Sequence, residues 1–343
     1  MTRVLVLMGG RSGEHDVSLV SARGVVDALT EGGFTPVPVV IDREGAWTRD
    51  GRPVTLGPGA GGVGRLIDLA DGSVDEVDVV FPVLHGPNGE DGTVQGLCEM
   101  ARLPYVGAGV AASAVSMDKA LFKALAMGHG LPVAEAVVVS AADWATQPDA
   151  VTAEVAASIG YPCFVKPARM GSSVGISRVS SPDGLDEAIV LALAADDKIL
   201  IERGVTSPRE VEVGLLGTPG DLVTSPPGEI TYDAEWYDYE TKYTDGRAQV
   251  TIPAALDPAL VSRLQALAEA AFELVGCHGL ARVDFLIAPD GEILLSELNT
   301  MPGFTPTSAF PSLMAQAGVP YPEAVRRLVT MAMDRAGART ATT

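Results

Sequence analysis

The stretch RVDFLIAPDGEILLSELNT, residues 282–300, predicts two β-strands joined by a tight turn. Asp290-Gly291 is among the strongest short hairpin signals, and the residues on either side alternate so that side chains two apart share a face. A two-residue turn pairs Pro289 with Glu292. This pairing sets the register of the whole predicted hairpin.

In that register Asp284 lies opposite Glu297, and Arg282 lies opposite Asn299. The same face continues toward the turn with apolar side chains, which are Leu286, Ala288, Ile293 and Leu295. Two carboxylates directly opposite each other destabilise a sheet unless something compensates their charge. Carboxylate and amide oxygens favour a hard cation, Mg²⁺ or Mn²⁺, over zinc. The sequence therefore predicts a metal site at a buried rim, with a solvated sheet edge as the alternative.

The composition indicates a large, acidic, globular protein. The chain has 343 residues, 47% of them hydrophobic, which is enough for two or three domains. Its formal net charge of −20 argues against nucleic acid or an anionic membrane as a partner. The three cysteines are far apart and show no metal-binding spacing, which suits a reducing cytosol. The first apolar run, at residues 4–8, is too short for a signal peptide or a membrane span.

Strand and helix patterns alternate in the first third of the chain. These elements are strands at 4–8, 36–42, 77–86 and 103–107, and helices at 14–33 and 92–101. Such alternation predicts an α/β protein whose N-terminal domain has a doubly wound parallel sheet, with ligands at the carboxyl ends of its strands. The loops MGGRSGE and HGPNGEDG follow two such ends.

We expect three domains along the chain. The N-terminal α/β domain spans residues 1–117, a central domain spans 118–209, and a C-terminal domain spans 210–343. The central domain holds KPARMGSSVGIS, residues 166–177, which predicts two strands around a Gly/Ser-rich turn. The C-terminal domain holds a predicted helix at 257–275 and the hairpin described above.

The Gly/Ser-rich segment 166–177 and the lysines point to a phosphate ligand. Only five of the 24 basic residues are lysine, which indicates that lysine marks places where a compact ammonium group is needed. Backbone N–H groups of such a loop can bind phosphate, and Lys166 directly before the loop supplies a charge. The P-loop pattern G-x-x-x-x-G-K-[ST] occurs nowhere in the chain, and an ordinary loop is the alternative interpretation.

Other patterns point less directly to function. The segment VGAGVAAS, residues 106–113, matches a dinucleotide-binding fingerprint, but no acidic residue ends a following strand, so we interpret it as a packing turn. His15 and His85 each follow a predicted strand, where a structural histidine is the ordinary interpretation. Glu14 stands where a helix begins at the sheet edge, a position from which it can pair with a ligand ammonium group.

Taken together, these segments resemble the D-alanine–D-alanine ligases, which are members of the ATP-grasp superfamily. The motifs that carry the resemblance occur in this order: MGGRSGEHDVSLVSA, LHGPNGEDGTVQG, SAVSMDK, FVKPARMGSSVGIS, YDYETKY, ARVDF and ELNTMPGFT. The resemblance runs from the first strand to about residue 325. It implies three α/β domains, with ATP held between the second and the third.

The resemblance implies nucleotide-binding roles for five residues. Lys119, Lys166 and Lys242 would contact the ATP phosphates. Glu202 would lie near the adenine, and Glu210 would hold the ribose.

It also implies roles for the residues of the hairpin and of the loop that follows. Asp284, Glu297 and Asn299 would ligate two Mg²⁺ ions, or Mn²⁺, which would explain why facing carboxylates are tolerated. Arg282 and the backbone N–H of Gly303 would hold a developing oxyanion.

The implied substrate-binding residues come from several segments. Glu14 would anchor the amino group of the first D-alanine, and Ser172 would link Glu14 to Tyr243 and close the site. The remaining substrate-binding residues are His85, Ser308 and Ala309. Ala309 stands where the family usually has leucine or another sizeable apolar residue, so the second substrate is the open question.

The function implied by the resemblance is ATP-dependent ligation of two D-alanines through an acyl phosphate, for the synthesis of peptidoglycan precursors. We expect a cytoplasmic homodimer that binds ATP and D-alanine and neither binds nucleic acid nor inserts into a membrane. One alternative is a D-alanine ligase with a different second substrate, such as D-serine or a larger D-amino acid. The other is a non-catalytic nucleotide-binding regulator on the same fold.

Overall fold

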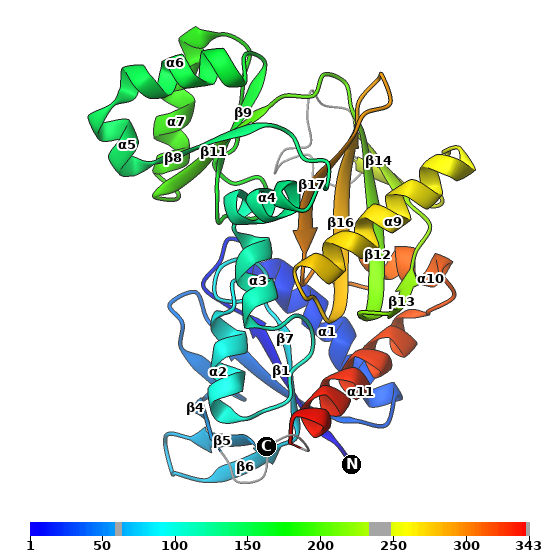
Figure 1. The fold of residues 1–343 in the computed structure, drawn as a ribbon. Helices are drawn as coiled ribbons and strands as arrows, with labels where there is room; N and C mark the ends of the chain where they lie inside the picture. Colours follow the sequence, from blue (N-terminus) through cyan, green and yellow to red (C-terminus); the bar gives the residue numbers. More distant parts are fainter. Residues whose placement is uncertain (59–63, 233–247, 341–343) are drawn as a thin grey trace.

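Three β-sheets with their covering helices make up the fold (Figure 1). The computed structural model describes residues 1–58, 64–232 and 248–340. One sheet falls within each predicted domain, except that the first strand of the third sheet begins at Arg209. The domain boundaries themselves stay predictions. Within these described ranges, no helix is both long and apolar enough to cross a membrane.

The first sheet has the strand order β6-β5-β4-β3-β2-β1-β7. Its strands are β1 (Arg3–Gly9), β2 (Thr35–Ile41), β3 (Trp47–Arg49), β4 (Arg52–Gly57), β5 (Gly64–Asp68), β6 (Val74–Val77) and β7 (Val79–Val83). Only β2, β1 and β7 run parallel, and antiparallel strands β3 to β6 extend the sheet. The strand predicted at 103–107 is reduced to one bridge between Val80 and Tyr105.

Helices cover both faces of the first sheet, as the doubly wound pattern predicts. Along β1, Val4 and Val6 point into a core shared with α1 and α11, whereas Leu5 and Leu7 point into a core shared with α2. These helices are α1 (His15–Glu31), α2 (Thr93–Ala101) and α11 (Tyr321–Thr340). In Figure 1 the red α11 lies beside the blue α1. The last described helix therefore completes the core of the first sheet.

The second sheet is antiparallel, with the order β10-β9-β11-β8. Its strands are β8 (Ala136–Ser140), β9 (Cys163–Pro167), β10 (Ser177–Val179) and β11 (Lys198–Arg203). Its helices are α5 (Ala141–Thr146), α6 (Pro148–Ser158) and α7 (Leu185–Leu193), with a 3₁₀ turn at Pro182–Gly184. The helices α3 (Val110–Met117) and α4 (Lys119–Gly128) precede this sheet, and buried side chains of both join the core of the third sheet.

The third sheet has the order β15-β14-β12-β16-β17, with β13 paired to β12. Its strands are β12 (Arg209–Thr218), β13 (Asp221–Thr224), β14 (Gly228–Tyr232), β15 (Ala248–Thr251), β16 (Gly279–Ile287) and β17 (Ile293–Asn299). The helix predicted at 257–275 is confirmed as α9 (Pro258–Leu274), and α10 spans Ala309–Gln316. Val213 and Val283 pack against α9, so the opposite face of the sheet is the one that carries Glu212, Arg282 and Asp284.

The far end of the predicted hairpin is confirmed: Asp284 pairs with Glu297, and Arg282 pairs with Asn299. The predicted two-residue turn is wrong. The backbone N–H of Ala288 donates to the carbonyl of Glu292 at 2.8 Å, so the turn holds three residues, and Gly291 has φ +91°. Proline at position 289 has no N–H to donate to such a ladder bond, and a glycine with positive φ commonly ends a three-residue turn.

A β-bulge restores the register beyond the turn. Phe285 pairs with Leu295, whereas Asp284 pairs with Glu297, so Ser296 is an extra residue on β17. The two-residue turn predicted Leu295 and Ile293 on the same face as Asp284. Because of the shift in register, both side chains instead belong to the core under α9. Leu286 remains on the face of Asp284.

Candidate active site

One cavity of about 750 Å³ collects the predicted site residues. It is lined by the loops that follow β1 and β7 of the first sheet, by strands of the second and third sheets, by α4, and by the loop before α10. Every predicted site residue in the described part of the chain lines it: Glu14, His85, Lys119, Lys166, Ser172, Glu202, Glu210, Arg282, Asp284, Glu297, Asn299, Gly303, Ser308 and Ala309. Lys242 and Tyr243 lie outside the described residues.

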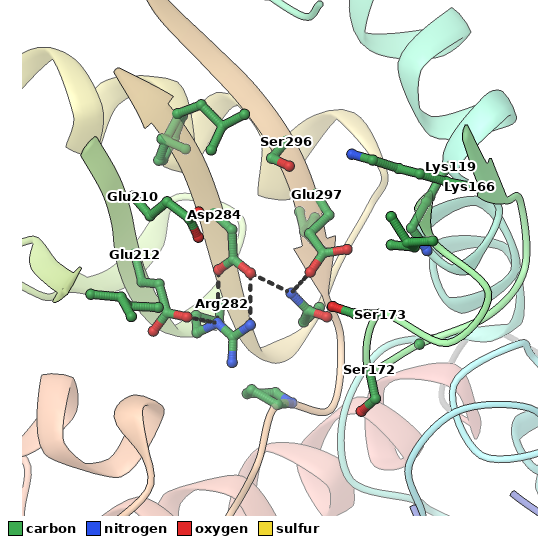
Figure 2. Close-up of a pocket in the computed structure, with 18 of the residues that line it drawn as sticks. Lys119, Lys166, Ser172, Ser173, Glu210, Glu212, Arg282, Asp284, Ser296 and Glu297 are labelled. Carbon is green, nitrogen blue, oxygen red and sulfur yellow. Dashed lines mark hydrogen bonds and ion pairs between the residues drawn. The ribbon is translucent and has the colours of Figure 1, made fainter. Parts of the chain in front are cut away.

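Arg282 is held by two carboxylates on neighbouring strands (Figure 2). Its Nε and Nη2 donate to the two oxygens of Asp284 at 2.7 and 2.6 Å, and its Nε lies 3.1 Å from Glu212 Oε1. Burial lowers the pKa of Arg282, but Asp284 and Glu212 outweigh that effect and raise it. Sequence reasoning missed Glu212, although its spacing of two from Glu210 already placed both on one face of a strand.

The predicted metal ligands lie together beside this pair. Asn299 Nδ2 donates to Asp284 Oδ2 at 3.0 Å and to Glu297 Oε1 at 3.4 Å. Burial raises the pKa of Asp284 to about 7, with the like charges of Glu212 and Glu297 adding to the rise and Arg282 opposing it. Arg282 and the amide of Asn299 thus offset part of the repulsion between the facing carboxylates of Asp284 and Glu297.

The chemistry of this group fits a hard cation. Asp284, Glu297 and Asn299 offer oxygen ligands only, and burial together with the nearby charges of Glu212 and Glu297 raises the pKa of Asp284, an effect that a bound cation would oppose. The group consists of two carboxylates and one amide; within residues 1–58, 64–232 and 248–340, no three His, Cys, Asp or Glu side chains gather as a metal cluster. A cation here would have to share Asp284 with Arg282.

A second charged cluster joins α4 to the second sheet. Glu202 on β11 lies 2.5 Å from the ammonium of Lys166 on β9 and 2.5 Å from that of Lys123 on α4. Burial raises the pKa of the Glu202 carboxyl, but the two lysines outweigh it and lower the pKa to about 2. Lys119 Nζ donates to the carbonyl of Met170 in the glycine-rich loop at 2.6 Å. Sequence reasoning missed Lys123, although it follows Lys119 by one helical turn.

The side of the cavity near these lysines combines apolar and acidic groups. Tyr232 donates its hydroxyl to Glu210 Oε1 at 2.5 Å. The apolar lining residues include Phe164, Ile176, Val205, Ile230 and Leu298. Such a slot suits a flat ring system with polar groups at its edge.

Glu14 and the glycine-rich loop meet across the cavity. Ser172 donates its hydroxyl to Glu14 Oε1 at 2.5 Å, a contact between residues 158 positions apart. Ser172 and Ser173 both have positive φ, 51° and 58°. A Cβ on Gly171 would lie 2.9 Å from Glu14 Oε2, so a larger residue at this position would displace the Glu14 carboxylate. The predicted contact between Glu14 and Ser172 is present, and its extension to Tyr243 stays a prediction.

His85 is buried and fixed by its neighbours. Its Nδ1 lies 3.0 Å from the carbonyl of Met301, which makes Nδ1 the protonated nitrogen, and its Nε2 lies 3.4 Å from Ser21 Oγ. Burial lowers the pKa of the His85 imidazole, although Glu14 acts in the opposite direction. The ring is therefore neutral at physiological pH and lines the cavity near Glu14.

Glu90 of the HGPNGEDG segment was not among the predicted site residues. Its carboxylate accepts from the backbone N–H of Gly86 at 2.7 Å and of Met301 at 3.2 Å. Burial, and then the charge of Glu14, raises its pKa to about 8. Glu90 therefore fastens the loop after β7 to the loop after β17. The signal available in the sequence was its place in a strand-end loop rich in glycine.

The loop before α10 forms the remaining wall. Ser308 precedes the first turn of α10, and its Oγ lies 2.7 Å from Thr305 Oγ1. Ala309 lines the cavity, whereas Phe310 is fully buried and its ring stacks on Phe304 with centroids 5.8 Å apart. The large neighbouring side chain thus points into the core and does not fill the space beside Ala309.

Comparisons with known proteins agree with this geometry. The family described as D-ala D-ala ligase N-terminus matches residues 3–108, and the family described as D-ala D-ala ligase C-terminus matches residues 125–330. The D-alanine–D-alanine ligase of Deinococcus radiodurans is 48% identical over 337 residues, covering 97% of this chain and 98% of that protein. That of Geobacillus thermodenitrificans is 43% identical over 357 residues, covering 97% and 96%.

Solved structures with the same fold come from two kinds of ligase. The D-alanine–D-alanine ligase from Coxiella burnetii has a TM-score of 0.86 and 30% identity, covering 99% of this chain and 96% of that one. The VanG D-Ala:D-Ser ligase from Enterococcus faecalis has a TM-score of 0.86 and 33% identity, covering 96% and 99%. The two family models together match most of the chain, and the curated relatives are similar over nearly its full length. The chain therefore belongs to the D-alanine–D-alanine ligase family.

Proposed function

We propose that this protein uses ATP to join two D-alanine molecules into D-alanyl-D-alanine for peptidoglycan precursor synthesis. The observation that carries the proposal is the 750 Å³ cavity, in which lysines that suit phosphate lie with a cluster of oxygen ligands and the carboxylate of Glu14. The alternative, considered below, is that the amino acid that accepts the acyl group is a D-amino acid other than D-alanine.

The reaction needs two steps because a carboxylate is a poor acyl donor. The carboxylate of the first D-alanine attacks the γ-phosphorus of ATP, which gives an acyl phosphate and ADP. The amine of the second D-alanine then attacks the acyl carbon. The tetrahedral intermediate expels inorganic phosphate, and the nitrogen loses its proton to leave a neutral amide. A closed cavity protects the acyl phosphate from water.

The residues around the first D-alanine have distinct proposed roles. Glu14 binds the substrate ammonium group, and Ser172 fixes the carboxylate of Glu14 through the 2.5 Å hydrogen bond. Tyr243, outside the described residues, is proposed to extend this contact. Arg282 and the N–H of Gly303 stabilise the oxyanion; one such donor is worth roughly 10²–10³ in rate. The bonds from Arg282 to Asp284 use Nε and Nη2, so Nη1 carries donors that Asp284 does not use.

The nucleotide would lie between the second and third sheets. Lys119 and Lys166 are proposed to contact its phosphates, with Lys242 joining them from outside the described residues. Glu202 and Glu210 are proposed to bind at the adenine and ribose edges, beside the apolar lining. Burial lowers the pKa of the Lys166 ammonium, but Glu202 outweighs it and raises the pKa, so Lys166 stays charged at neutral pH.

Asp284, Glu297 and Asn299 are proposed to hold two Mg²⁺ ions, with Mn²⁺ as a substitute. When bound, such ions neutralise phosphate charge and align the transferred group. The oxygen-only ligand set and the buried position of Asp284 beside the carboxylates of Glu212 and Glu297 support this assignment.

For the second substrate, specific observations also favour a molecule other than D-alanine. His85, Ser308 and Ala309 are proposed to line the substrate sites, and Ala309 leaves space that Phe310 does not fill. A relative of 33% identity bears the name of a D-Ala:D-Ser ligase. Acceptors larger than D-alanine, such as D-serine or D-2-aminobutyrate, are therefore the second candidate.

We also propose that the enzyme works as a homodimer in the cytoplasm, as its family resemblance implies. Three buried, unpaired cysteine thiols are compatible with a reducing compartment. Light scattering after gel filtration tests the dimer independently of activity.

The deciding experiment supplies ATP, Mg²⁺ and D-alanine, alone or with varied second D-amino or D-hydroxy acids, and identifies the product by mass. We expect one ADP and one phosphate for each dipeptide formed, and little ADP without an amino acid. Binding of ATP with no dipeptide from any acceptor would instead favour a non-catalytic regulator.

A further inference from the structure

We infer that Lys123 is a positioning residue for the nucleotide, acting through Glu202 to keep the phosphate side of the cavity positively charged. The inference rests on the proposed function and deepens it. It starts from the contact described above, in which Glu202 lies between two ammonium groups at 2.5 Å each.

All three side chains are shielded from water. Their exposed fractions are 6% for Lys123, 4% for Glu202 and 16% for Lys166. They come from three separate elements, α4, β11 and β9, and all three line the cavity. Low exposure makes their charges felt over a longer range than those of surface pairs.

The charge balance of this triad is what matters for a polyphosphate. Lys166 with Glu202 alone would sum to zero, so a phosphate would meet a neutral pair. Adding Lys123 gives two positive charges and one negative, a net charge of +1. The carboxylate then divides its attraction between two ammonium groups, and Lys166 keeps more of its own charge for a ligand.

The helix positions Lys123 for this task. Lys119 and Lys123 are four residues apart on α4 and therefore lie on one face. Lys119 reaches the glycine-rich loop through the carbonyl of Met170, while Lys123 reaches Glu202. One helix face thus supplies both a loop anchor and a balancing charge to the same cavity.

A purely structural role makes a different prediction. If Lys123 only compensated the buried carboxylate, its removal would reduce stability, and removing the Glu202 charge as well would not restore nucleotide affinity. If it sets the charge, the Lys123→Met variant has a neutral triad, and the double variant Lys123→Met with Glu202→Gln returns to +1.

The test measures dissociation constants of ATP and of adenosine by calorimetry, at one salt concentration with Mg²⁺ present. The ratio of the two constants isolates the phosphate contribution, because any adenine contact of Glu202 affects both ligands. We expect Lys123→Met to lower ATP affinity relative to adenosine roughly tenfold. Adding Glu202→Gln should recover most of that loss, and Lys123→Arg should keep the ratio near that of the parent protein.

A matched control removes a positive charge elsewhere. Arg209 forms a bidentate ion pair with Glu229 and does not line the cavity, so Arg209→Met should leave the ratio unchanged. Thermal unfolding of every variant separates misfolding from weak binding. The inference is overturned if folded Lys123→Met keeps the parent ratio, if Arg209→Met lowers it equally, or if Glu202→Gln brings no recovery. Failure of the proposed function looks different, since the parent protein itself would then form no dipeptide.

Discussion

Replacing Glu14 with glutamine tests the proposed anchor for the first D-alanine most directly. The variant keeps the shape of the side chain, and its amide oxygen can still accept the hydrogen bond from Ser172 that Glu14 Oε1 accepts at 2.5 Å. Glu14 precedes α1 but makes no side-chain cap hydrogen bond, so the helix loses no cap. What the variant loses is the negative charge facing a substrate ammonium group.

The size of the loss follows from that charge. A hydrogen bond to a charged group contributes about 1.5–3 kcal/mol, which corresponds to roughly 10- to 100-fold in binding. We therefore expect Glu14→Gln to raise the KM for the first D-alanine by that factor, with the KM for ATP changed by less than about twofold. Initial rates of ADP release, with D-alanine and ATP varied in turn, separate the two constants.

Ser172→Ala is the companion variant, because it removes the supporting hydroxyl and leaves the charge of Glu14 in place. The lost hydrogen bond joins Ser172 to Glu14 and not to the substrate, so its effect on the first-site KM should be smaller than that of removing the charge of Glu14. Equal and small changes in both KM values for Glu14→Gln would refute the assignment. So would a larger first-site effect from Ser172→Ala than from Glu14→Gln.

Three further outcomes are expected. Glu297→Gln should remove most of the turnover, and near-normal ADP release at saturating Mg²⁺ would contradict its role as a metal ligand. Ala309→Leu should shift the product ratio toward D-alanine and away from D-2-aminobutyrate, since each methylene in an apolar pocket is worth about 1–3 kcal/mol of discrimination; an unchanged ratio would mean that Ala309 does not shape that site. Glu90 has its pKa raised from 4.5 to about 8, so the folded state binds its proton more tightly than the unfolded chain does. The stability it contributes is complete below pH 4.5 and is lost as the pH rises through about 8. Denaturant midpoints measured across this range should therefore fall less steeply in Glu90→Gln, and parallel slopes would show that Glu90 does not titrate there.

The hairpin shows which parts of a fold can be predicted from local sequence. The alternation of side chains and the Asp-Gly signal predicted a hairpin in which Asp284 lies opposite Glu297, and this pairing holds because the three-residue turn and the bulge shift the register in opposite directions. They were not enough to predict the bulge at Ser296, because the extra residue is fixed by what lies behind the strand. It turns Leu295 into the core beneath α9, a helix that lies outside the hairpin itself.

The same reason explains the site residues that were missed. Lys123 and Glu212 act through partners on other elements, and those pairings depend on how α4 meets β11 and how β12 meets β16. Glu90 likewise depends on a loop more than 200 residues later, through the N–H of Met301. The resemblance supplied roles for residues inside its motifs, but the supporting partners came only from three-dimensional packing.

The packing of α11 on the first sheet has a consequence for synthesis of the protein. Domains made first on the ribosome generally fold first. Here the apolar face of β1 is covered partly by Val325, Leu328 and Val329, which are translated near the end of the described chain. Until these residues have left the ribosome, α1 covers that face without α11, so part of its apolar surface stays exposed while the rest of the polypeptide is made, which favours aggregation or chaperone binding in that interval.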